Sequence, residues 1–267
     1  MSDAVAVFGD LKAESDELDL IVRGLGEAQW ARDTPAPGWT VAHQIAHLAW
    51  TDAVALLAVT DPGAFAVEAE RAAGAPATFV DEAARAGAAQ PVPVLLARWR
   101  DGRERLGAAL DKAPPGARFP WYGPPMSAPS LATARLMETW AHGQDIADAL
   151  GVTRTPTARL RHVARIGVRA RDYAHLVRGE EPPAEQFRVE LTGPSGELWA
   201  YGPEEAGQYV TGPALDFCLL VTQRAHRADL AVRAKGADAD HWLEIAQAFA
   251  GPPGAGRAPR GLPGRGV

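Results

Sequence analysis

Apolar side chains recur at helical spacing along the first two-thirds of the chain, and charged residues fill most positions between them. This pattern predicts a first helix around residues 11–25 and a second over about 41–58, with Thr40 as its N-cap. A third stripe over residues 92–110 predicts another helix, which Pro114 and the residues after it end. The N-terminal part of the chain is therefore expected to be a helical bundle.

Two segments beside these stripes lack periodicity. Residues 61–90 mix Gly and Pro with short alanine-rich pieces, which is typical of a long connection with at most one short helix. Residues 117–130 hold four prolines and a glycine, so an irregular loop is expected there. The loop carries Trp121 and Tyr122, and such an aromatic loop often folds over a pocket.

After this loop, apolar residues again recur at helical spacing. Further along the chain, apolar and polar residues alternate instead. A helix is predicted over residues 128–150, with Ser127 as its cap and Gly151 as its stop, and a fifth helix over 157–178. From Glu180 onward, the segments FRVELTG and ELWAYG alternate apolar and polar residues around a turn, which indicates a β-hairpin.

The last third completes a small α/β unit. Residues 214–224 predict a buried helix, 229–234 a strand and 240–250 a closing helix. The final residues hold six glycines and four prolines, too little apolar surface to order by themselves, although their start could be anchored. We therefore expect an α+β chain with a helical domain, a small α/β domain and a tail, over residues 1–179, 180–250 and 251–267.

Composition narrows the class of partner. The chain has 267 residues, 47% of them hydrophobic, which suffices for one large core or two modest ones. A net charge of −6 and a pI near 5.7 argue against a nucleic-acid partner and favour a small-molecule substrate. No signal sequence and no membrane-spanning apolar window is evident. The expectation is a cytoplasmic monomer or homodimer without a membrane partner.

The single cysteine, Cys218, excludes an intrachain disulfide and a thiolate-rich zinc site. It lies in the apolar run FCLLV, which favours a small core residue over a nucleophile.

Glu138 and His142 are the strongest candidates for chemistry. Side chains four residues apart on a helix lie on one face, so a carboxylate and an imidazole can share a metal ion. His47, on the second predicted helix, could complete a three-ligand set that leaves positions open for water or substrate. Arg135 and Asp145 lie on roughly the same face and are candidates for substrate or ligand-supporting contacts. By spacing alone, a solvated pair or a core histidine is the more common outcome.

A rival ligand pair lies within the second helix. His43 and His47 form H-Q-I-A-H, which is similar to the H-E-x-x-H motif of zinc peptidases. Gln44 stands where that motif needs a glutamate as general base, so peptidase action is not expected. The simpler interpretation of His43 is a polar residue in the first helical turn.

Three segments carry a resemblance to a known family. WTVAHQIAHLAWTD, RLMETWAHGQDIADALG and VTGPALDFCLLVTQR resemble the mycothiol-dependent maleylpyruvate isomerase family, within the DinB-like superfamily. The resemblance covers nearly the whole chain, and the ending WLEIAQAFAGPPGAGR looks like an actinobacterial subgroup without a settled activity. It implies a DinB-like bundle with a four-helix core and with His47, Glu138 and His142 as metal ligands.

The resemblance also implies a mechanism. Arg224 best matches an arginine that assists in the family's isomerase, although Arg227 competes for that role. A cation that only stabilises the helix C-terminus is an equally open interpretation of Arg224. A divalent ion, zinc first and nickel, iron or manganese as other candidates, would activate mycothiol for addition to an electrophile. Arg224 would orient a carboxylate, and Trp121 or Tyr122 would shield the site.

The sequence thus supports a metal- and thiol-dependent isomerase or S-transferase. Two other hypotheses stay open. One is a thiol-independent metal-dependent hydrolase, lyase or cyclase of secondary metabolism. The other is a non-catalytic protein that binds a small molecule or a metal.

Overall fold

Two sets of elements follow one another along the chain, and the computed structural model describes them over residues 3–261. Contacts between residues group Met1–Arg154 into one unit, the N-terminal unit, and the chain from Thr155 onward into another, the C-terminal unit. Within residues 3–261, no helix is both long enough and apolar enough to cross a lipid bilayer.

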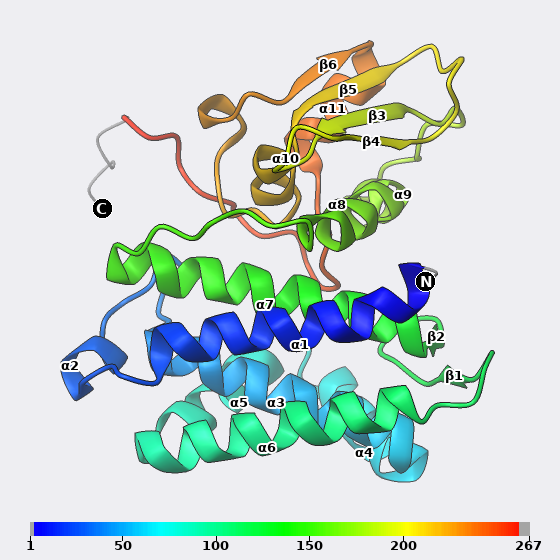
Figure 1. Ribbon diagram of the computed structural model, residues 1–267. Coiled ribbons are helices and arrows are strands. Elements are labelled where there is room, and N and C mark those ends of the chain that lie inside the picture. The colour runs from blue at the N-terminus through cyan, green and yellow to red at the C-terminus, as the bar shows by residue number, and fades with distance from the viewer. Residues whose placement is uncertain (1–2, 262–267) are drawn as a thin grey trace. The chain divides into compact units, whose positions relative to one another are not determined.

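The N-terminal unit is almost entirely helical. Its elements are α1 (Asp3–Val22), α2 (Glu27–Trp30), α3 (Val41–Thr60), α4 (Pro62–Gly74), α5 (Phe79–Ala88), α6 (Val92–Asp111), β1 (Arg118–Phe119), β2 (Met126–Ser127) and α7 (Ala128–Leu150). The long helices α1, α3, α6 and α7 pack together (Figure 1), which confirms the predicted four-helix core. Leu18, Ile45, Trp99 and Ile146, one from each of these helices, are fully buried in the shared core.

Local capping explains why α3 and α7 begin and end where they do. The Thr40 N–H donates to Nδ1 of His43 (3.3 Å) at the start of α3, which confirms the plain interpretation of His43. Ser127 accepts a hydrogen bond from the Ser130 N–H (3.3 Å) at the start of α7. Gly151 ends α7 in the left-handed conformation, with φ of 70°. These two helices therefore match their predicted bounds closely.

Residues 61–90 depart from the prediction, because they form the two helices α4 and α5 rather than a long connection. Asp61 caps α4 by accepting the Ala64 N–H (3.0 Å), with Pro62 in the first turn. Helix α5 packs closely on α3, since a Cβ added at Gly87 would lie 2.7 Å from Cβ of Ala46. The glycine that weakens the sequence pattern is the residue that permits this contact.

The proline-rich loop is also more regular than predicted. Arg118 pairs with Ser127 and Phe119 with Met126 in a short antiparallel ladder, β1 with β2. The intervening prolines lie outside the paired residues, where no ladder hydrogen bond is needed.

The C-terminal unit combines a small sheet with short helices. Its elements are α8 (Leu160–Arg169), α9 (Arg171–Leu176), β3 (Arg188–Thr192), β4 (Leu198–Tyr201), β5 (Tyr209–Pro213), α10 (Ala214–Val221), the 3₁₀ turn η1 (Arg227–Asp229), β6 (Arg233–Lys235) and α11 (Ala237–Ile245). The strand order is β4-β3-β5-β6, with β3 parallel to β5 and the other pairs antiparallel. The predicted hairpin is present, whereas β5 was not predicted.

The fifth predicted helix differs in two respects. It is broken at Ala170 into α8 and α9. These helices pack against α10, α11 and β4, so they group with the C-terminal unit. The contacts thus divide the chain near residue 154 rather than at the predicted boundary of 179.

Residues 251–261 of the predicted tail form neither helix nor strand. The Gly251 N–H donates to the Tyr173 hydroxyl (2.9 Å), and the Arg260 N–H donates to Asp229 (2.8 Å). The rest of the predicted tail, residues 262–267, lies outside the described residues.

Candidate metal centre

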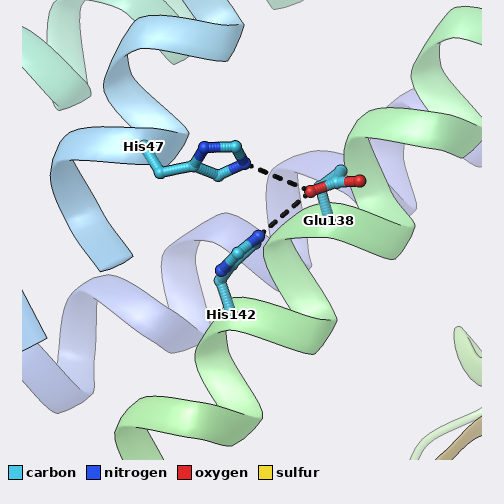
Figure 2. A group of neighbouring side chains, drawn as sticks. All are labelled: His47, Glu138 and His142. Carbon is cyan, nitrogen blue, oxygen red and sulfur yellow. Dashed lines mark hydrogen bonds and ion pairs between the residues drawn. The ribbon is translucent and has the colours of Figure 1, made fainter. Parts of the chain in front are cut away.

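His47 on α3 and the pair Glu138 and His142 on α7 converge on one point (Figure 2). Nε2 of His47 lies 3.4 Å from Oε2 of Glu138, and Nε2 of His142 lies 3.1 Å from the same oxygen. One ligand atom from each residue lies within 4.8 Å of the others. The structure thus brings together the three residues that the sequence singled out, across a separation of 91 residues between His47 and Glu138.

The cluster is shielded but not sealed from solvent. The side chains of His47 and His142 are 9% and 11% exposed, whereas the Glu138 side chain is 22% exposed. Burial acts to raise the pKa of Glu138, but hydrogen bonds from His142 and His47 outweigh it and hold that pKa well below 4.5. Glu138 is therefore a carboxylate at neutral pH.

This donor set fits a divalent ion of the zinc class. Two imidazoles and one carboxylate are ordinary ligands of zinc, nickel, iron and manganese, and three protein ligands leave positions for water or substrate. Magnesium and calcium prefer sites built from oxygen atoms alone. The two helices that carry the three residues belong to one packed core, which fixes their positions relative to each other.

A hydrogen-bond relay that the sequence analysis missed orients His142. Nδ1 of His142 is hydrogen-bonded to Oε1 of Gln44, and Nε2 of Gln44 donates to the Thr34 hydroxyl (2.8 Å). That hydroxyl donates in turn to the backbone carbonyl of Trp39 (2.7 Å). Because Gln44 Oε1 can only accept, Nδ1 of His142 donates to it, and Nε2 is the ring nitrogen that faces Glu138 and would be offered to an ion. The sequence analysis considered Gln44 only because it replaces the glutamate of the zinc-peptidase motif, and it did not predict this role.

Replacing Gln44 by leucine is expected to weaken metal affinity by about 10–100-fold, because His142 loses its acceptor and its preferred tautomer. Glutamate at the same position keeps the acceptor and is expected to retain affinity within a few-fold. Competition against a chromogenic chelator measures both values. Equal affinity in Gln44→Leu and the parent would show that the relay does not orient the ligand.

Two tryptophans flank the histidines. The Trp39 ring is stacked on the His142 ring with centroids 5.9 Å apart, and it lies 5.3 Å from the His47 ring. Its Nε1 donates to Asp81 (2.9 Å), which fixes the indole. The Trp50 ring lies 5.8 Å from the His47 ring. The sequence analysis did not single out Trp39. Its position immediately before Thr40, the N-cap of α3, is the feature that could have identified it.

The N-terminal unit also contains the residues that were predicted to contact a substrate or to support the metal ligands. Arg135 donates from Nε to Asp52 (2.9 Å), and both side chains are buried, so this pair joins α3 to α7 beside the cluster. Asp145 is buried one turn beyond His142. Trp121 and Tyr122 pack on Phe65, with ring centroids 5.9 and 5.5 Å away.

Two of the predicted residues lie in the C-terminal unit. Arg224 follows α10 and donates to the Thr222 carbonyl (2.6 Å), a contact expected of a cation at a helix C-terminus. Cys218 is fully buried, and its Sγ lies 3.5 Å from the Leu160 carbonyl. Burial raises the pKa of its thiol, as expected for a core residue.

Comparison with known proteins matches both parts of the chain to families. Residues 11–147 match the mycothiol maleylpyruvate isomerase N-terminal domain. Residues 183–235 match a family described as wyosine base formation. The first match spans all three residues of the cluster.

Solved structures agree with the first match, and two relatives resemble the whole chain in sequence. Two uncharacterized proteins, from two strains of Mycobacterium tuberculosis, are each 58% identical to this chain over 257 residues, 96% of this chain and all of the relative. Crystal structures of the mycothiol-dependent maleylpyruvate isomerase and of a mutant of it share the fold, with a TM-score of 0.58. They are 17% and 16% identical in sequence and cover 88% of this chain and 95% of theirs. The chain belongs to the mycothiol maleylpyruvate isomerase family.

Proposed function

We propose that this protein is a metal-dependent enzyme that uses a low-molecular-weight thiol, mycothiol, as cofactor or co-substrate. Its reaction is an isomerisation or an S-transfer on a small electrophilic substrate. The observation that carries the proposal is the convergence of His47, Glu138 and His142, with His142 held by Gln44. Membership of a family named for a mycothiol-dependent isomerase supplies the choice of thiol.

The residues of the cluster would hold the ion through two neutral imidazoles and one carboxylate. Bound there, a divalent ion lowers the pKa of a coordinated thiol and so supplies a thiolate at neutral pH. Glu138 offsets part of the positive charge, and its low pKa keeps it ionised throughout the physiological range. Trp39 and Trp50 limit the access of water to the imidazoles, which favours the thiol over hydroxide as nucleophile.

The thiol must come from outside the chain. Cys218 is the single cysteine, it is fully buried, and burial raises its thiol pKa, so it is not a nucleophile at neutral pH. An external thiol that adds to an electrophilic carbon turns a cis double bond into a single bond, which can rotate before the thiol is eliminated. A transferase would release the conjugate instead. Arg224 is proposed to orient a carboxylate of the substrate or of the thiol.

Cys218 is expected to resist thiol reagents in the folded protein. At about pH 8, an aromatic disulfide reagent should release no measurable chromophore from native protein, and one equivalent after denaturation. The Cys218→Ala variant should keep its thiol-dependent activity. Loss of activity in a folded Cys218→Ala variant would assign the nucleophile to the protein itself.

The direct test compares turnover of maleylpyruvate, as a model cis electrophile, with and without mycothiol in zinc-loaded protein. We expect turnover only when both the ion and the thiol are present. Cysteine at the same concentration is the control for a generic thiol effect. Turnover of other substrates that needs the ion but not mycothiol would replace the proposal with a thiol-independent metalloenzyme.

A further inference from the structure

The C-terminal unit holds a second convergence of two imidazoles and one carboxylate. Oε2 of Glu180 lies 3.1 Å from Nδ1 of His175 and 2.7 Å from Nε2 of His241. One ligand atom from each residue lies within 4.8 Å of the others. We call His175, Glu180 and His241 the second trio.

Local backbone geometry brings two members of the second trio together. His175 lies in the last turn of α9, and Gly179 adopts the left-handed conformation with φ of 73°. The chain therefore folds back, and the Glu180 N–H donates to the His175 carbonyl (3.1 Å). This fold of the chain places the Glu180 side chain next to the imidazole of His175, five residues earlier. His241 comes from α11, which packs against α9.

We propose that the second trio binds a divalent transition-metal ion of the zinc class. Two nitrogen donors and one oxygen donor match that class and disfavour calcium and magnesium, which prefer oxygen ligands. In a tetrahedral zinc site, ligand atoms lie about 3.3–3.6 Å apart, given bonds of about 2.0–2.2 Å. The contacts from the Glu180 oxygen, 3.1 and 2.7 Å, are somewhat shorter than that spacing, so the side chains would move slightly apart around an ion.

The second trio is buried on one side and open to solvent on the other, so an ion can reach it. His175 is 1% exposed, so it forms the inner wall of the site, whereas Glu180 and His241 are 37% and 48% exposed at their side chains. Water fills the remaining coordination positions on the open side. The ion joins the end of α9 to α11, so it stabilises the folded C-terminal unit by mass action. This site does not depend on the proposed function.

The test uses tag-free, full-length protein in which His47→Ala and His142→Ala remove the first cluster. Titration with Co²⁺ alone, followed by its visible absorption, and elemental analysis after zinc loading both count bound ions. We expect one equivalent in this double variant, and none when Glu180→Gln or His241→Ala is added. His226→Ala is the matched control, because His226 is another imidazole of the same unit that instead accepts the Ala228 N–H.

Thermal unfolding gives a second readout. Zinc is expected to raise the melting temperature of the double variant and of its His226→Ala derivative, and to leave the Glu180→Gln derivative unchanged. No bound ion in the folded double variant overturns the proposal. So does an equal count with and without His241. Circular dichroism checks folding, and Glu180→Gln keeps the side-chain volume if His241→Ala fails to fold. Equal counts in the parent and the double variant would instead refute the first cluster.

Discussion

Replacing His142 by alanine is expected to remove one equivalent of bound metal and to abolish turnover. The ion loses one of its three protein ligands, and Glu138 loses the closer of its two imidazole partners, at 3.1 Å. Loss of a residue that only supports a ligand costs about 10–100-fold in affinity, so loss of the ligand itself should exceed 100-fold. Elemental analysis of purified protein and competition with a chelator measure the effect, and His47→Ala should behave alike.

His43→Ala is the matched control for this prediction. It removes an imidazole from α3, the helix that carries His47, but this imidazole is a cap partner of Thr40 and does not face Glu138. We expect unchanged metal content and a loss of about 1 kcal/mol in unfolding free energy. If His43→Ala loses the ion while His47→Ala keeps it, the ligand assignment is wrong.

Replacing Arg135 by leucine is expected to destabilise the protein by about 3–5 kcal/mol at neutral pH, because the buried Asp52 carboxylate is left without its partner. Denaturant unfolding measures the change. The Asp52→Leu/Arg135→Leu double variant removes both charges and is expected to be much closer to the parent. A double variant as unstable as Arg135→Leu alone would assign the loss to packing rather than to charge.

The pH dependence of Arg135→Leu follows from Asp52. Burial raises the pKa of Asp52 and Arg135 opposes that rise, so the pKa should rise further when the arginine is removed. A carboxyl with a raised pKa binds its proton more tightly in the folded than in the unfolded state. Its contribution to stability is present at acid pH and is lost as pH rises through the folded pKa. The destabilisation should therefore shrink as pH falls toward the ordinary pKa of an aspartate, about 3.9, and grow as pH rises.

The sequence predicted best those features that are decided locally. The bounds of α3 and α7 follow from Thr40, Ser127 and Gly151, which act on the helix turns beside them. Because both helices have defined ends, the faces that carry His47 and Glu138 could be assigned before the fold was known. The resemblance supplied the pairing of those two faces, which spacing alone left open.

Features decided by distant contacts were missed. Helix α5 depends on Gly87 fitting against Ala46, and β5 depends on parallel pairing with β3, neither of which appears in local periodicity. The role of Gln44 depends on His142, 98 residues later. An amide between two histidines has no local mark that distinguishes a ligand-orienting group from an ordinary polar residue.

The stacking of Trp39 on His142 has a practical consequence. The Trp39 ring lies 5.9 Å from the imidazole of His142, the proposed metal ligand. If an ion binds there, we expect paramagnetic Co²⁺ to quench Trp39 fluorescence and zinc to leave it unchanged. The chain has eight tryptophans, so Trp39→Phe is needed to assign the signal by difference. If the quenched fraction disappears in that variant, the fluorescence of Trp39 reports whether an ion is bound. Exchange of one metal for another could then be followed in real time without any added dye.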